Sequence, residues 1–184
     1  MKTQNLFIPI LMAAMLVFSS CSSQSSAESA NTTADGDIHG AIISDNMDAV
    51  KKYISNGGDL NAKDPFGGSS PLITATVFGK PEMAKVLIDA GADINFQNNE
   101  GSTALITAAF FCRPEIVKML LDKNADKTVV NKYGTTAYDN VAGPFDQMKD
   151  AYDMMVAMLG PMGLKLDYDY LKKTRPEIAA MLKP

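Results

Sequence analysis

The side chains best suited to catalysis and metal binding are scarce in this chain of 184 residues. It has one histidine, His39, and two cysteines, Cys21 and Cys112. A zinc site built from cysteine and histidine needs about four ligands, and these three lie far apart in the sequence. As a general base, His39 would need a nucleophile or water within reach and a group that orients its ring. The sequence offers no such constellation, so it does not predict catalysis by His39.

Cys112 leaves two interpretations open. The first is an unpaired, partly buried thiol without chemistry of its own. The second is a redox-sensing thiol, which would require a lowered pKa; the adjacent Arg113 is the feature that supports it.

The carboxylates do not form a catalytic pair. Asp167 and Asp169 flank Tyr168 and could suggest a cation site, but a solvated helix start fits them better, because acidic residues stabilise helix N-termini. No phosphate-binding loop or metal cluster appears, so we expect neither an enzyme nor a bound cofactor. The formal net charge is −4 and no basic block exists, so nucleic acid is not an expected partner.

The first twenty residues have the pattern of a secretory signal peptide. Lys2 supplies a basic start, and residues 6–18 form an apolar run that is too short to span a bilayer. Residues 17–21 resemble the bacterial lipobox, although Phe18 stands where leucine is usual. The resemblance implies that Cys21 is lipidated and becomes the first residue of the mature chain. The alternative is an ordinary signal peptide with an incidental cysteine.

The residues after Cys21 are small and polar and cannot pack into a core. They predict a flexible tether over residues 21–36 and a folded domain over residues 37–184. Lipidation of Cys21 would leave Cys112 without a partner for an intramolecular disulfide. Ser22 resembles a sorting signal for the outer membrane, on its periplasmic side or at the cell surface, and not for the inner membrane.

A period of 33 residues runs through the middle of the chain. Residues 68–75 match residues 101–108 at this offset, and residues 81–88 match residues 114–121. An earlier copy, beginning at Ile38, lies 34 residues before the second. A fixed period of this length indicates a stack of similar structural units.

Residues 68–75 and 101–108 match in part the pattern Gly-x-Thr-Pro-Leu-His-x-Ala, and an apolar helix and then Gly-Ala-Asp or Asn-Ala-Asp follow each of them. Together these three features resemble the ankyrin repeat. The resemblance implies an all-α solenoid of paired antiparallel helices with β-turn loops, in four to five repeats. No unit buries its apolar face alone, so stacking must do so. The expected repeats are about 37–64, 65–98, 99–131 and 132–163, followed by a C-terminal cap at 164–184.

Local signals place the helix ends. Ser70 and Thr103 can cap the first helices of their units through a side-chain oxygen. Pro81 and Pro114 suit the first turn of the second helices, where no backbone N–H is needed. Gly91 fits a left-handed helix terminus.

The resemblance also implies structural roles for several polar residues. His39 occupies the histidine position of the family's Thr-Pro-Leu-His motif, where the ring hydrogen-bonds between loops. Asp59, Asp93 and Asp126 recur at the period and are implied to structure the loops.

The C-terminal region departs from the repeat. Residues 145–159 predict a longer helix with Met148, Tyr152, Met155 and Leu159 on one face. Residues 168–173 and 175–182 are expected to form the two helices of a terminal cap.

Partners of ankyrin proteins usually contact the turn tips and the exposed end of each first helix, on the concave face. Five of the ten positions that correspond in this chain are aromatic, which suggests a protein-binding surface. The alternative is that some of these rings pack against neighbouring units. The ten are Ile43, Ser44, Phe66, Val77, Phe78, Glu100, Phe110, Phe111, Lys132 and Tyr133.

These observations predict a monomeric, non-catalytic binding module of the bacterial cell envelope, which grips one protein partner with its concave face. The role would be that of an inhibitor, an immunity protein or a protective factor. The alternative is a structural tether that organises the envelope through several weak contacts.

Overall fold

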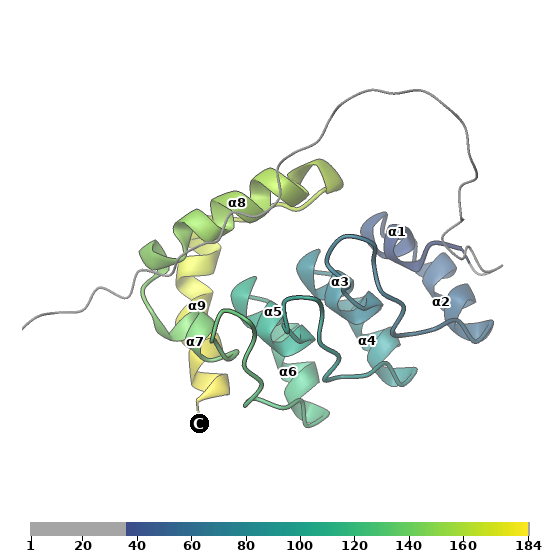
Figure 1. The fold of residues 1–184 in the computed structure, drawn as a ribbon, viewed down its shortest axis with the longest axis horizontal. Helices are drawn as coiled ribbons and strands as arrows, with labels where there is room; N and C mark the ends of the chain where they lie inside the picture. The colour runs from purple at the N-terminus through teal and green to yellow at the C-terminus, as the bar shows by residue number, and fades with distance from the viewer. Residues whose placement is uncertain (1–35, 184) are drawn as a thin grey trace, which may run out of the picture. The chain divides into compact units, whose positions relative to one another are not determined.

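The computed structural model describes residues 36–183, and every regular element in that range is helical (Figure 1). The predicted all-α fold is therefore confirmed. In chain order the elements are α1 (Ile38–Ile43), α2 (Met47–Ser55), α3 (Pro71–Val77), α4 (Pro81–Asp89), α5 (Ala104–Phe110), α6 (Pro114–Asp122), α7 (Asp139–Ala142), η1 (Phe145–Gln147), α8 (Lys149–Leu159), η2 (Gly160–Met162) and α9 (Tyr168–Leu182).

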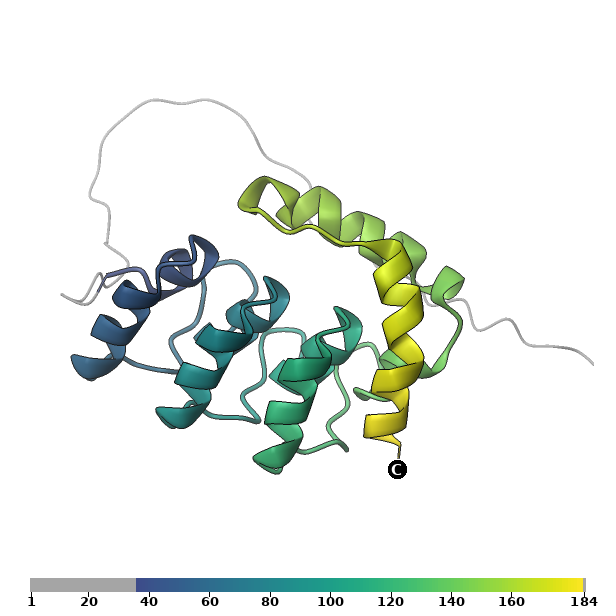
Figure 2. The ribbon, with the colours of Figure 1, turned by 180° about the vertical axis from the view of Figure 1, so that it is seen from behind.

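The helices form two rows. In one row α1, α3, α5 and α7 pack against one another in that order, and in the other α2, α4, α6 and α9 do so (Figures 1 and 2). Within each of the first three units a tight turn joins the two helices, as in α3 and α4. This is the predicted ankyrin-repeat solenoid of paired helices.

The helix starts lie where the sequence places them. Ser70 accepts a hydrogen bond from the Ile73 N–H at 3.4 Å, and Thr103 accepts the equivalent bond from Ile106 at 3.3 Å. Pro81 and Pro114 are the first residues of α4 and α6, where the N–H that proline lacks has no helical partner in any case. These predictions are confirmed.

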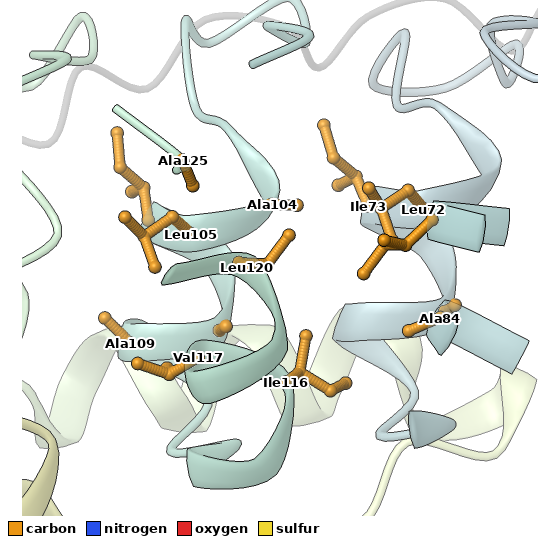
Figure 3. Packing of buried hydrophobic residues seen from close by; sticks show 14 of the residues in the cluster. Leu72, Ile73, Ala84, Ala104, Leu105, Ala109, Ile116, Val117, Leu120 and Ala125 are labelled. Atoms are coloured by element: carbon orange, nitrogen blue, oxygen red, sulfur yellow. The ribbon is translucent and has the colours of Figure 1, made fainter. Parts of the chain in front are cut away.

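The core lies between the two rows of helices. Figure 3 shows side chains of α5 and α6 meeting there, among them Leu105, Val117 and Leu120, each at most 1% exposed. Ala75 and Ala108 are completely buried. Small side chains at these positions let adjacent helices approach closely, which is how each unit buries its apolar face against its neighbours.

Polar side chains fix the loops between units. Asp59, Asp93 and Asp126 each accept a hydrogen bond from the backbone N–H two residues further on, at 2.8–2.9 Å. Asn61 and Asn95 then accept the N–H of the aspartate in the next unit. The structural role of the three aspartates is confirmed, and the bonds tie successive loops together.

His39 joins two units through its ring. Nε2 lies 3.1 Å from the Ala62 carbonyl oxygen, and Nδ1 lies 2.8 Å from the Thr74 hydroxyl oxygen. Because a carbonyl oxygen can only accept, Nε2 donates to Ala62, and in the neutral ring Nδ1 then accepts the hydrogen bond from the Thr74 hydroxyl. Both ring nitrogens are thus occupied in the structural role that was expected.

The fourth unit is interrupted. Its first helix is the short α7, and α9 packs against both α7 and α6, where the second helix of a fourth unit belongs. The segment with η1, α8 and η2 is inserted between them. Among the described residues the two rows therefore end after four units.

The expectation of two cap helices at 168–173 and 175–182 is wrong, because α9 is one continuous helix that contains Pro176. Proline removes one backbone hydrogen bond from a helix interior, but Pro176 itself is exposed. The opposite face buries five side chains, and this packing outweighs the lost bond. They are Leu171, Thr174, Arg175, Ile178 and Leu182.

Candidate protein-binding surface

The turn tips are rigid because one side chain in each of three units holds the backbone of its turn. Asp64 accepts hydrogen bonds from the N–H groups of Phe66, Gly67 and Ser69. Burial alone would raise the pKa of Asp64, but these bonds to the carboxylate lower it below its ordinary value. Asn98 and Asn131 hold the next two turns in the same way.

Backbone hydrogen bonds also join neighbouring tips. The Asn99 N–H donates to the Gly67 carbonyl, and the Lys132 N–H donates to the Glu100 carbonyl, both at 2.9 Å. Four predicted site residues lie on these tips, and all four are exposed. The two aromatic residues among them, Phe66 and Tyr133, are 85% and 61% exposed. We call the four residues the turn-tip row: Phe66, Glu100, Lys132 and Tyr133.

The other six predicted residues lie where the first helices end, and we call them the helix-end row. Ser44 is exposed, and five side chains are partly or fully buried. The row consists of the last residue and the C-cap of α1, α3 and α5: Ile43, Ser44, Val77, Phe78, Phe110 and Phe111.

The structure corrects the prediction for Phe111, whose side chain is only 4% exposed. Its ring lies edge-on against Phe110, with 4.9 Å between centroids, and Phe110 packs on Tyr152 of α8 at 4.8 Å. The Tyr152 hydroxyl donates to the Phe110 carbonyl at 2.8 Å. Helix α8 thus covers this end of α5, and Phe111 is not accessible to a partner.

Helix α8 brings a second apolar surface that the sequence analysis missed. It runs from the α7–α9 end of the stack back toward α1 (Figure 1). Its exposed face carries Met154 and Met158, and Met162 follows in η2; the three side chains are exposed by 39%, 62% and 38%. We call them the methionine stripe. The four-residue spacing of these methionines could have predicted this surface, but the sequence prediction concerned only the opposite face of the helix, which carries Tyr152.

Cys112 is buried and has a raised pKa. Its Sγ lies 3.8 Å from the Leu171 carbonyl oxygen, and its side chain is 0% exposed. Burial raises the pKa of the thiol to about 11, and the positive charges of Arg175 and Arg113 offset this only in part. This is the opposite of what a redox-sensing thiol requires, so the structural interpretation is favoured.

We expect the Cys112 thiol to react very slowly in the folded protein. At pH 8, about one thiol in a thousand would be ionised with this pKa, and the sulfur is covered as well. The measurement is titration with a disulfide reagent of the full chain carrying Cys21→Ser, with and without urea. Equal rates in the two conditions would show that the thiol is accessible in the folded state.

The acidic residues near the C-terminus have a structural role. Asp167 caps α9 by accepting hydrogen bonds from the N–H groups of Asp169 and Tyr170, so the expected helix start is confirmed. Within residues 36–183 no group of three or more metal-ligating side chains is close enough to hold a metal ion. In the same range no helix is long and apolar enough to cross a membrane.

The two rows of paired helices define a helical repeat protein. A model of the family described as "Ankyrin repeats (3 copies)" matches residues 38–131. The chain belongs to the ankyrin-repeat family, whose members generally bind other proteins.

Similar proteins support the same assignment. Over 64 residues the chain is 36% identical to "Protein phosphatase 1 regulatory subunit 27" of Homo sapiens, a match that covers 35% of this chain and 41% of the relative. It is 38% identical over 76 residues to a "Putative ankyrin repeat protein" of Rickettsia bellii (strain RML369-C), covering 39% and 11%. The chain therefore spans about two fifths, or less, of these relatives' lengths.

A solved structure agrees with the fold. The ankyrin repeat domain of Bcl-3, described as a unique member of the IkappaB protein family, superposes with a TM-score of 0.54 at 29% identity. The match covers 56% of this chain and 45% of that chain.

Proposed function

We propose that this protein is a non-catalytic binding module that grips one protein partner with its concave face. The observation that carries the proposal is the turn-tip row, where two aromatic side chains are largely exposed on a rigid backbone. Aromatic residues dominate binding energy at protein interfaces. Because hydrogen bonds already fix the tips, little conformational entropy is lost when a partner binds.

The partner would be held between the turn tips and the accessible part of the helix-end row. Val77 and Phe78 are partly buried at the end of α3, so they would add apolar contact beside the exposed rings. Glu100 and Lys132 carry opposite charges on neighbouring tips and would set the orientation of the partner. An inhibitory or protective role is consistent with the regulatory subunit among the relatives.

We further propose that the protein is a monomer held in the bacterial cell envelope by a lipid on Cys21, with the outer membrane favoured over the inner. The support is the sequence pattern of the first 21 residues and Ser22 after the cysteine. The signal peptide over residues 1–20, Cys21 and the tether up to residue 35 lie outside the described residues.

A second candidate is a tether that organises the envelope through several weak contacts. The methionine stripe favours it, because α8 offers a further exposed apolar surface on a different element. Methionine side chains adapt to varied partners. A tether would lose only part of its binding when one surface is changed, whereas a dedicated binder would lose nearly all of it.

We expect a Phe66→Ser, Tyr133→Ser variant to lose a partner that the parent retains from envelope extract of the source organism. Truncation of an anchor residue costs about 2 kcal/mol or more, or roughly thirtyfold in affinity. The bait is the full chain carrying Cys21→Ser, and circular dichroism checks that each variant is folded.

Met158→Ser is the matched control, because Met158 is 62% exposed and Tyr133 61%. Retention by the parent and by Met158→Ser, with loss from the double variant, supports the dedicated binder. Partial loss from both variants supports the tether. If all three baits retain the same proteins, or none retains any, the proposed surface is wrong.

A further inference from the structure

Three successive turns of the stack share one backbone geometry. Asp45, Gly79 and Cys112 follow the C-caps of α1, α3 and α5 and adopt φ values of 62°, 63° and 51°. The residue after each, as in Lys80 and Arg113, donates its N–H to a helix carbonyl at 2.8 Å. The three turns are therefore equivalent, and their side chains can be compared position by position.

In the first of these turns a carboxylate meets a cation of the next unit. Asp45 Oδ2 lies 2.9 Å from Nζ of Lys80. Arg113 is the equivalent of Lys80 one unit later, and Gly79 is the equivalent of Asp45. Arg113 thus reaches toward a turn where the acidic side chain is missing.

The guanidinium of Arg113 lies beside the space that an aspartate at position 79 would enter. A Cβ added to Gly79 would be 2.8 Å from Cζ and 2.9 Å from Nε of Arg113. One terminal nitrogen donates to the Val77 carbonyl at 3.2 Å. Nε is buried and has no hydrogen-bond partner, and no carboxylate within residues 36–183 forms an ion pair with Arg113.

A cavity of about 220 Å³ opens at this point. Besides Gly79 and Arg113, the side chain of Tyr170 from α9 contributes to its wall, together with the first residues of α4 and α6. Burial lowers the pKa of Arg113 from its ordinary value, which is the sign of a desolvated cation without a counter-charge. Glu115 also lines the cavity, but it forms no ion pair with Arg113, so the guanidinium keeps no carboxylate partner among residues 36–183.

We propose that this cavity receives an aspartate or glutamate side chain of the protein partner, with Arg113 as the main donor and the Tyr170 hydroxyl as a second. The site rests on the proposed function, since a partner must supply the carboxylate. A water molecule occupies about 30 Å³ in the liquid, so the volume admits a carboxyl group. The cavity lies next to Val77 and Phe78 of the helix-end row, so one partner would reach both.

The first test uses sodium acetate as the probe and needs no partner. The backbone amide signal of Ile116, which lines the cavity and is present in every variant, is followed by NMR in the full chain, with sodium chloride at equal ionic strength as the reference. We expect a saturable shift with acetate. Gly79→Asp, which supplies an internal carboxylate as Asp45 does for Lys80, should weaken the acetate response at least tenfold.

Gly91→Asp is the matched control. Gly91 is also left-handed, at φ 94°, and a Cβ there would meet nothing within 4 Å, so the same substitution adds the same charge away from the cavity. Its response to acetate should equal that of the parent. Arg113→Gln is the second test variant, should Gly79→Asp not fold, and it too should lose the response. No acetate shift beyond that of chloride, or equal shifts in all variants, overturns the proposal.

The second test uses the captured partner. Gly79→Asp should weaken its binding about tenfold or more, as expected for a charge-assisted hydrogen bond, and Gly91→Asp should not. If the partner binds the parent and Gly79→Asp equally, the cavity proposal fails while the proposed function stands. If acetate binds but no partner is captured, the proposed function fails while the carboxylate site stands.

Discussion

Replacement of Tyr152 by alanine should lower the free energy of unfolding by about 3–5 kcal/mol, the range for removing a large buried aromatic side chain. Tyr152 is 0% exposed, and its ring packs on Phe110 and on Phe145, with centroids 4.8 and 5.5 Å apart. Its hydroxyl donates to the Phe110 carbonyl and accepts a hydrogen bond from Arg175 at 2.9 Å. Alanine would remove the contacts that fasten α8 to α5 and α9.

Loss of the hydroxyl alone should cost less. Arg175 is 3% exposed and donates to Tyr152 and to the Gly143 carbonyl, so Tyr152→Phe leaves a buried cation with one acceptor fewer. We expect about 1–3 kcal/mol for this variant. Urea unfolding followed by circular dichroism measures both. Equal stability of the two variants would mean that the ring contributes nothing and that α8 is held by the hydrogen bonds.

The repeating part of the fold could be predicted because its signals are local. Ser70 and Thr103 cap their helices through bonds to the residue three positions on, and Pro81 and Pro114 begin theirs. Each such feature acts within a few residues and recurs at a fixed offset. The sequence therefore carries the same helix-start signals in several repeats, and the fold can still be predicted when one repeat matches the pattern poorly.

The C-terminal region could not be predicted in the same way. The continuity of α9 through Pro176 depends on contacts with α6 and α7, which lie far away in sequence and have no repeat as a template. The local signal of proline pointed to a break at this position. Tertiary packing reversed it, since most helical stability in proteins comes from a buried face.

For the candidate surface, too, the positions that local signals determine could be predicted from the sequence, and those that depend on the C-terminal region could not. The period located the turn tips correctly, because Phe66 and Tyr133 take their exposure from turns that Asp64 and Asn131 hold locally. The end of α5 is covered instead by α8, a segment outside the repeat, through the contacts of Tyr152 with Phe110. The period placed Phe111 at the end of α5, but it carried no information about what covers that end.

Ile178→Ala should destabilise the whole stack by about 2–5 kcal/mol, the cost of truncating a buried isoleucine. Ile178 is 0% exposed on the face of α9 that packs against α6 and α7. Each unit of a solenoid is stabilised by its nearest neighbours, and α9 packs against α6 of the preceding unit. A loosened α9 should therefore lower the stability of the unit containing α5 and α6 as well.

Urea unfolding combined with amide hydrogen exchange tests this prediction. Lys173→Ala is the control on the exposed side of α9 and should change the stability by no more than about 0.5 kcal/mol. With Ile178→Ala we expect one cooperative transition at lower urea and reduced protection in α6, around Leu120. If only α9 loses protection and the transition of the remaining units is unchanged, α9 is a passive extension of the stack. We expect the cooperative result because α9 is well buried against the stack: besides Ile178, Leu171 and Leu182 are each only 1% exposed.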